Sequence, residues 1–219
     1  GKFDEDGKPQ VLLGHNIPLA SAGVLILWLG WFGFNGGSVL SAAPTLTSLT
    51  LVTTCLAAAA GGISAAIFSN MLYKNFDLTM FMNGVLGGLV GITAGADQMS
   101  PMDAVLIGLI AGVIIVLGVA LIDRLKLDDP VGAVAVHLIC GIWGTLAVGI
   151  FGELAGLDQV LIQLAGIGII GAFSAISATI IILIVKALTG GSIRVSKEAE
   201  LKGLDLAEHG MDAYADFRI

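Results

Sequence analysis

His137 is the one ionisable side chain that lies well inside an apolar segment of this 219-residue sequence. An ionisable group is expensive to bury in an apolar medium, so such a position indicates a functional role by default. Helical spacing puts Gly141 and Gly144 on the same face as His137, which leaves room beside the ring for a substrate or for a neighbouring backbone. The residues alone leave open a structural histidine that hydrogen-bonds a carbonyl between two helices.

Haem ligation is a third chemistry open to His137. A bis-histidine haem would need a second buried histidine, and both His15 and His209 lie outside the apolar segments. The two cysteines, Cys55 and Cys140, lie in apolar segments and form neither a disulfide framework nor a metal cluster. We therefore expect no metal and no cofactor.

Residues 30–38 combine aromatic rings with a hydroxyl group. They read GWFGFNGGS and end the first apolar segment. Aromatic faces attract cations by roughly 0.5–2 kcal/mol, although the same residues also suit an ordinary aromatic belt at a membrane interface. Away from their ends the apolar segments contain no Asp or Glu, which argues against a cation pathway lined by acids.

The composition of the chain shows what must surround these residues. Hydrophobic residues make up 56% of the sequence and charged residues 12%, about half the charged fraction of a water-soluble domain. Most of the surface must therefore face something other than water, and lipid is the expected surrounding. The net charge of −7 excludes the basic surface of a nucleic-acid-binding protein.

Six apolar stretches have the character of membrane-spanning helices, which need about 17–25 residues, although the third stretch is short. Strands are excluded because the stretches are too long and lack alternation, and because only closed hydrogen bonding survives in lipid. The sequence therefore predicts an all-α membrane protein, a six-span helical bundle. The predicted spans are residues 17–34, 46–70, 79–93, 102–122, 131–151 and 160–185.

The distribution of basic residues predicts the orientation of the spans. All ten lysines and arginines lie on one side of the predicted arrangement, and the opposite loops contain none. Basic residues stay on the cytoplasmic side, so both termini are expected there. The predicted parts are a cytoplasmic segment (1–16), a six-helix transmembrane domain (17–187) and a cytoplasmic tail (188–219), in the plasma (inner) membrane.

A helix-start signal precedes the fifth span. Asp129 is predicted to cap the free backbone amides of this helix, and Pro130 suits its first helical position. We interpret both residues as structural.

Glycines spaced four residues apart recur in the third and fourth spans. Gly84 with Gly88, and Gly108 with Gly112, predict close approach of helix backbones. Residues 166–171 match G-x-G-x-x-G, but the run lies within an apolar span and no acidic residue follows at about 20 positions, so we reject nucleotide binding.

Three stretches of the sequence resemble the ammonium transporters of the Amt/Mep/Rh type. Residues 14–38, with GHNIP and GWFGFNGGS, resemble the sixth helix of that family. Residues 128–144, with DDP, VH and GIWG, resemble its tenth helix. Residues 203–214, with GLD, EHG and AY, resemble its cytosolic tail. The resemblance extends over nearly the whole chain.

The resemblance implies roles for individual residues. His137 corresponds to one of two pore histidines, Phe34 to one of two stacked phenylalanines that gate the outer end, and Ser38 to the hydroxyl of the external ammonium-recruitment site. Trp31 lies near the same pore wall, and Thr93 resembles a threonine of the conducting path.

The resemblance also implies a function and partners. It implies transport of ammonium or ammonia through an apolar pore across the lipid bilayer, by a homotrimer with one pore per subunit whose cytosolic face P-II signalling proteins can block. Such a protein is not an enzyme. The family has eleven spans in two inverted halves, and this chain resembles only the sixth to the eleventh. The first-half helices, which carry the partner histidine and partner phenylalanine, are therefore expected partners.

Three other interpretations stay open. A non-conducting half-protein that scaffolds or regulates a complete transporter would account for the missing first half. A membrane haem protein or a general solute carrier fits the hydropathy but leaves the series of motifs unexplained.

Overall fold

The computed structural model describes residues 2–3, 7–9 and 14–213, so parts of both predicted cytoplasmic segments lie outside the described residues. The predicted apolar stretches coincide, in order, with helices, which confirms the all-α prediction, although the fifth helical stretch begins at residue 133 and not at residue 131. These helices are α1 (Ile17–Ser38), α2 (Pro44–Tyr73), α3 (Leu78–Thr93), α4 (Pro101–Arg124), the π-helix η1 (Val134–Ile139) continued by α5 (Cys140–Phe151), and α6 (Leu157–Leu188). Two short helices follow, α7 (Lys197–Lys202) and α8 (Leu204–His209).

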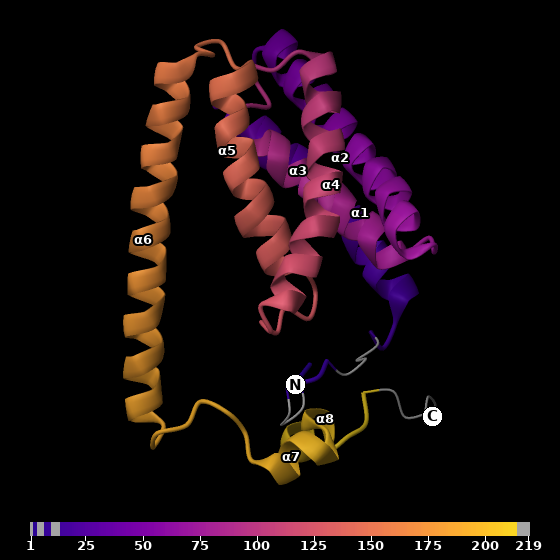
Figure 1. Cartoon of the computed structure of the whole chain (residues 1–219), viewed down its shortest axis with the longest axis vertical. Helices are drawn as coiled ribbons and strands as arrows, with labels where there is room; N and C mark the ends of the chain where they lie inside the picture. Colours follow the sequence, from indigo (N-terminus) through magenta and orange to yellow (C-terminus); the bar gives the residue numbers. More distant parts are fainter. Residues whose placement is uncertain (1, 4–6, 10–13, 214–219) are drawn as a thin grey trace. The chain divides into compact units, whose positions relative to one another are not determined.

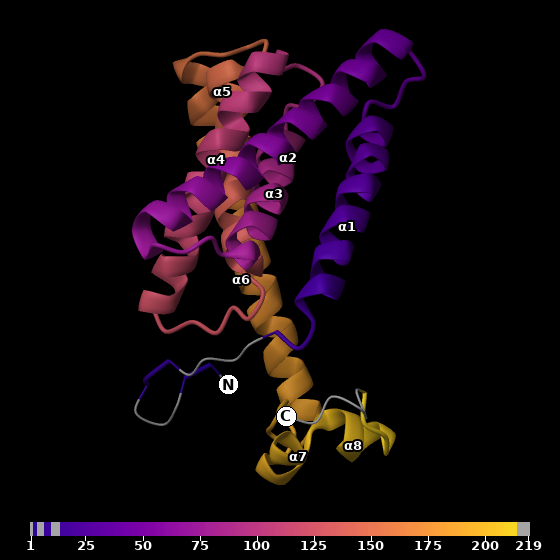
Figure 2. The same cartoon turned by 90° about the vertical axis from the view of Figure 1, so that its right-hand side faces the viewer.

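The chain divides into two compact units, residues 1–167 and 168–219, and the division falls inside α6. In the first unit, α2 packs against both α3 and α4, and α3 also contacts α1, η1 and α5 (Figure 1, Figure 2). Most of α3 is thus enclosed by other helices of this unit. The predicted boundaries of the three parts remain a prediction.

The length of α3 sets it apart from the other apolar helices. Among the described residues, five helices are long and apolar enough to cross a membrane, whereas α3 has 16 residues and is about 24 Å long. Beyond its end the chain turns back within protein: Ala96 is buried, and the Thr53 hydroxyl donates to its carbonyl at 2.6 Å. Non-helical backbone is tolerated at membrane depth where protein covers it and satisfies its polar groups.

Glycines bring α3 and α4 against the backbone of α2. A Cβ atom added at Gly88 would lie 2.1 Å from the carbonyl oxygen of Ala57, and one added at Gly108 would lie 2.3 Å from the same atom. A Cβ added at Gly84 would meet the carbonyl of Gly61 at 2.5 Å. Helices in lipid associate through such close packing. The predicted close approach of helix backbones is confirmed.

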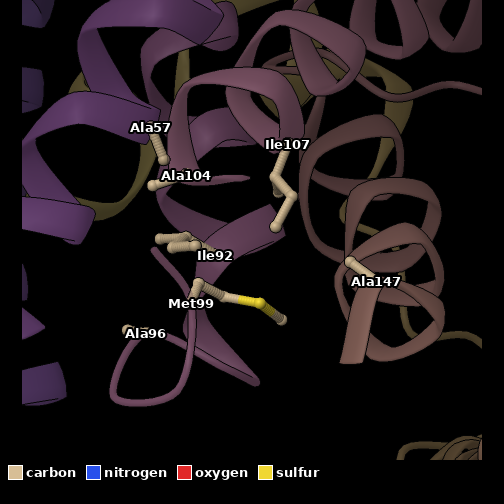
Figure 3. Close-up of a cluster of buried hydrophobic side chains, with 7 residues drawn as sticks. All are labelled: Ala57, Ile92, Ala96, Met99, Ala104, Ile107 and Ala147. Atoms are coloured by element: carbon tan, nitrogen blue, oxygen red, sulfur yellow. The ribbon is translucent and has the colours of Figure 1, made fainter. Parts of the chain in front are cut away.

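Small side chains also dominate one end of the core. A buried cluster joins α2, α3, the turn after α3, α4 and α5 (Figure 3). Its members are Ala57, Ile92, Ala96, Met99, Ala104, Ile107 and Ala147. Four of the seven are alanines, so the helices sit close together, and the three larger side chains fill the spaces between them.

Polar side chains fix α1 at both ends. The Asn16 side-chain oxygen accepts the N–H of Leu19 at 2.9 Å and caps the start of the helix. Near the other end, the buried Asn35 amide donates to the Thr54 hydroxyl on α2 at 3.0 Å. The first contact fixes where α1 begins, and the second ties to α2 the end of α1 that carries Trp31 and Phe34.

The second unit contains residues 168–188 of α6 together with α7 and α8. Ser196 caps α7 by accepting the N–H of Ala199. After α8 the chain folds back, so that the Asp205 carboxylate accepts the N–H of Ala213 at 3.0 Å. This hydrogen bond and one from Leu206 favour the ionised carboxylate and lower the pKa of Asp205.

Candidate functional site

A groove of about 700 Å³ lies in the first unit where α1, α3, η1 and α5 meet. The groove is open on one side rather than enclosed. Four residues singled out from the sequence, Trp31, Phe34, Thr93 and His137, share this lining. The full lining consists of Ile26, Leu27, Gly30, Trp31, Phe34, Val90, Thr93, Ala94, His137, Gly141 and Thr145.

Trp31 and Thr93 join the two walls of the groove. The indole N–H of Trp31 donates to the Thr93 hydroxyl at 2.8 Å, and that hydroxyl donates in turn to the Leu89 carbonyl at 2.7 Å. Phe34 meets Trp31 edge to face, with ring centroids 5.8 Å apart and an interplanar angle of 66°. Phe34 is itself 59% exposed, so its ring stands at the open side of the groove with Trp31 as its support.

His137 has a different setting from the one that hydropathy predicts. Its position inside an apolar stretch predicts a buried ring, but the residue is exposed to the open groove, because no helix among the described residues of the first unit covers this face of η1. Within the described part of the chain, its imidazole has no hydrogen-bond partner. Among the described residues, His137 therefore does not form the hydrogen bond to a carbonyl between helices that a structural histidine would form.

The remaining polar groups of the lining are already engaged. The Thr145 hydroxyl donates to the Gly141 carbonyl at 2.9 Å, as Thr93 does to Leu89, and the Trp31 N–H is taken by Thr93. Neutral imidazole has one donor and one acceptor. His137 is thus the side chain of the lining that can both donate a hydrogen bond to a small polar molecule and accept one from it.

The sequence matches the Ammonium Transporter Family over residues 1–214. The chain belongs to the ammonium transporter family. It is 40% identical to ammonium transporter Amt2 of Archaeoglobus fulgidus, over 99% of this chain and 50% of that protein. It is 42% identical to a putative ammonium transporter of Synechocystis sp., over 96% of this chain and 48% of that protein. The solved structure of a sensor Amt protein matches with a TM-score of 0.88 at 38% identity, over 94% of this chain and 53% of that chain.

Membership of the ammonium transporter family, together with five long apolar helices, makes this a multi-pass membrane protein. The chain spans about half the length of the curated relatives that it matches. This chain, with its open groove, therefore aligns with only part of each of these larger proteins.

Ser38, another site residue predicted from the sequence, lies outside the groove lining. It is the last residue of α1, and its hydroxyl donates to the Phe34 carbonyl at 2.7 Å. The hydroxyl proton is thus used within the helix, which leaves the oxygen as an acceptor in an exposed position. The link between Ser38 and the groove is this hydrogen bond to the main chain of Phe34, whose side chain belongs to the lining.

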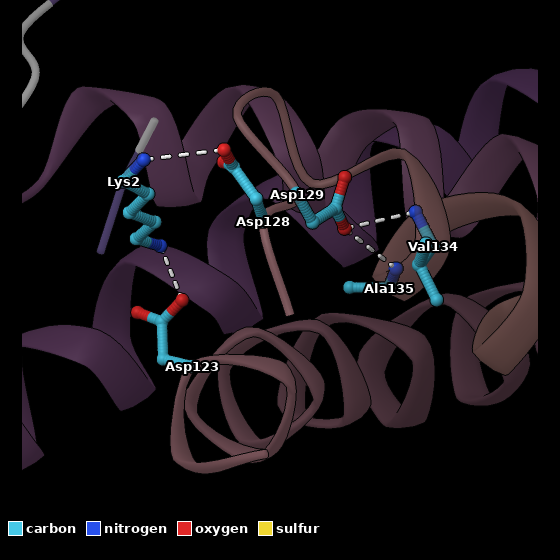
Figure 4. A network of polar contacts seen from close by, with 6 residues as sticks. All are labelled: Lys2, Asp123, Asp128, Asp129, Val134 and Ala135. Carbon is cyan, nitrogen blue, oxygen red and sulfur yellow. Dashed lines mark hydrogen bonds and ion pairs between the residues drawn. The ribbon is translucent and has the colours of Figure 1, made fainter. Parts of the chain in front are cut away.

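Asp129 and Pro130 lie before the helix that carries His137. The Asp129 carboxylate accepts the N–H groups of Val134 and Ala135 at 2.9 and 3.4 Å (Figure 4). Pro130 lies in a turn, and the helical stretch begins three residues later, at residue 133. The first helical position predicted for Pro130 is therefore wrong, because the chain first turns through Gly132, whose φ is +74°.

Gly144 does not share the groove with Gly141, although the sequence analysis places both beside His137. A Cβ atom added at Gly144 would lie 2.6 Å from the carbonyl oxygen of Gly91 on α3, so Gly144 serves helix packing. At Gly141 the nearest atom, on Val90, would be 3.9 Å from such a Cβ. Only Gly141 leaves space beside the histidine.

Two features of the site escaped the sequence analysis. The α1 side of the lining repeats at helical spacing through Ile26, Leu27 and Gly30 to Trp31 and Phe34, and this periodicity was available to find it. The π-helical turn over Val134–Ile139 has no comparable signal. Such turns depend on how neighbouring helices pack, and they are frequent at functional sites.

Proposed function

We propose that this chain supplies one wall of an ammonium and ammonia path across the membrane, lined by His137, Phe34, Trp31 and Thr93. The observation that carries the proposal is the groove, because it gathers these four residues from three separate helical segments. Its lining contains no charged side chain, so it favours a neutral passenger over a permanent cation. The role is that of a transporter and not of an enzyme.

The chemistry of the lining suggests a sequence of events. Ammonium arrives at the end of the groove near Phe34 and the Ser38 oxygen, where aromatic rings and a hydroxyl acceptor favour a cation. Entry into the apolar groove disfavours the charged form, so ammonium gives a proton to water at the mouth of the groove, and neutral ammonia moves on. The His137 imidazole then accepts a hydrogen bond from the passing ammonia and donates one to it.

Orientation and partners belong to the same proposal. The distribution of basic residues supports cytoplasmic termini in a plasma (inner) membrane. The open side of the groove supports closure by first-half helices of the same family, because an apolar path must exclude water along its whole length. The homotrimer and the P-II signalling partner rest on the family resemblance. The parts 1–16, 17–187 and 188–219 are proposed as cytoplasmic segment, membrane domain and cytoplasmic tail.

A second candidate is a non-conducting half-protein that scaffolds or regulates a complete transporter. The observation that favours it is the open groove in a chain that spans half of its relatives. Both candidates are tested in proteoliposomes that contain either this chain alone or this chain together with first-half helices of the family. Ammonium flux that requires both parts supports the proposed path. A chain that never conducts, but changes the flux of a separate complete transporter, supports the scaffold.

A further inference from the structure

Lys2 contacts the last turn of α4 and the connection that leads from α4 to the His137 helix (Figure 4). Its ammonium group forms an ion pair with Asp123, in the last turn of α4. Its backbone N–H donates to the Asp128 carboxylate at 3.2 Å. A residue far from this connection in the sequence thus fastens it at two points.

The second of these points is directly linked to the His137 helix. Asp128 precedes Asp129, whose carboxylate holds the N–H groups of Val134 and Ala135. These amides belong to the first turn of η1, and His137 lies three residues after Val134. A displacement of Asp128 therefore moves its neighbour, the cap, and with it the turn that carries the imidazole.

The π-helical form of η1 makes its start sensitive to such displacement. A π-turn is rare and is retained only where its surroundings favour it over the α-helix. Asp129 reaches past the ordinary start of a helix to bind amides five and six residues ahead. The position of that carboxylate therefore helps to decide where the first turn is anchored.

We propose that Lys2 is a positioning residue for His137, which acts through Asp123, Asp128 and the Asp129 cap. Lys2 is thereby joined to the turn that precedes the helix carrying His137. The inference rests on the proposed function for its effect on transport, but the structural coupling itself does not depend on it.

The test compares Lys2→Met with Lys186→Met in this chain combined with first-half helices of the family, reconstituted in liposomes. Lys2→Met removes the ion pair with Asp123 and keeps the length of the side chain, while Lys186→Met removes a basic residue from the last turn of α6. Hydrogen–deuterium exchange at Val134 and Ala135 is measured. Because the ion pair is partly exposed, we expect a rise in exchange of about two- to fivefold for Lys2→Met and none for Lys186→Met.

Coupling through Asp123 adds a second criterion. Asp123→Asn should raise exchange like Lys2→Met, and the double variant should do no more than either single variant. Lys2→Asp combined with Asp123→Lys should restore slow exchange, which also separates loss of the pair from general misfolding. Unchanged exchange in Lys2→Met, or a double variant whose effects add, overturns the inference.

Ammonium flux in the same vesicles separates this inference from the proposed function. A positioning role predicts that Lys2→Met lowers the maximal rate and leaves the apparent ammonium affinity unchanged, because recruitment occurs near Phe34 and not at His137. If the unmodified protein carries no ammonium, the proposed function fails, and the exchange data alone decide whether Lys2 positions His137. If exchange rises while flux stays normal, the positioning role in transport is overturned.

Discussion

The interface of α2 with α3 and α4 and the groove beside α1 use the same residue types for opposite purposes. In the interface, Gly88 and Gly108 face the Ala57 carbonyl so closely that no Cβ atom would fit. In the groove, an added Cβ at Gly30 would have no atom within 4 Å. Glycine thus closes one space and leaves the other open, and the count of glycines in a span does not distinguish the two roles.

Threonine shows the same contrast. In the interface, the Thr53 hydroxyl donates to the Ala96 carbonyl, 43 residues away. In the groove, the Thr145 hydroxyl donates to Gly141 in its own helix. The Thr53 hydroxyl therefore connects two separate segments, whereas the Thr145 hydroxyl stays within its own helix.

Gly88→Ala should have the largest effect on stability. The new Cβ atom would lie 2.1 Å from the Ala57 carbonyl oxygen, so α3 and α2 must separate. We expect a loss of about 1–3 kcal/mol or more in the free energy of unfolding. Gly30→Ala is the matched change in the groove and should leave stability nearly unchanged. Equal losses in unfolding titrations in detergent would contradict the distinction between the two regions.

Thr53→Val should have the next largest effect. It keeps the shape of the side chain and leaves the buried Ala96 carbonyl without this donor, which should cost about 1 kcal/mol. Thr145→Val removes a hydroxyl that bonds only within its helix, so its effect should be close to zero. The same unfolding titrations measure both variants. A loss for Thr145→Val as large as that for Thr53→Val would show that the two classes of hydroxyl are not different.

The Trp31–Thr93 contact should contribute a smaller coupling. Trp31→Phe and Thr93→Val each remove one partner of the 2.8 Å hydrogen bond. A double-mutant cycle should give a coupling energy of about 0.6 kcal/mol. A coupling of zero would mean that the two walls of the groove are held together by other contacts. The cycle is read from the same unfolding midpoints.

The fold-back of the tail should show a local effect confined to low pH. The pKa of Asp205 lies below its ordinary value, mainly because its carboxylate accepts the Ala213 N–H. A lowered pKa means that the contact is fully present at neutral pH and is lost only as the pH falls through the pKa of the folded form. Amide exchange at Ala213 should therefore accelerate only in acid, and Asp205→Asn should accelerate it already at neutral pH. Acceleration at neutral pH in the unchanged chain would contradict this account.

The sequence predicted the order of the helices better than the direction of individual side chains. The order of the six apolar stretches and the glycine contacts follow from local composition and spacing. The exposure of His137 does not, because it depends on which helices lie opposite. The packing role of Gly144 likewise arises from its contact with α3, which is distant in the sequence. The turn at Pro130 differs, because the left-handed Gly132 lies only two residues away and is a local signal.

The central claim is that His137 lines the path that ammonia takes. His137→Leu keeps a side chain of similar bulk and removes both polar atoms, and Leu138→Ala changes the next residue, which is exposed and outside the groove lining. Both variants are made in a protein that includes the first-half helices, and ammonium flux and electrical current are recorded from the same proteoliposomes. The account predicts that His137→Leu assembles normally but conducts less ammonium, or loses the coupling of flux to charge movement, while Leu138→Ala behaves as the unmodified protein. A leucine variant that carries ammonium and charge as the unmodified protein does would contradict it.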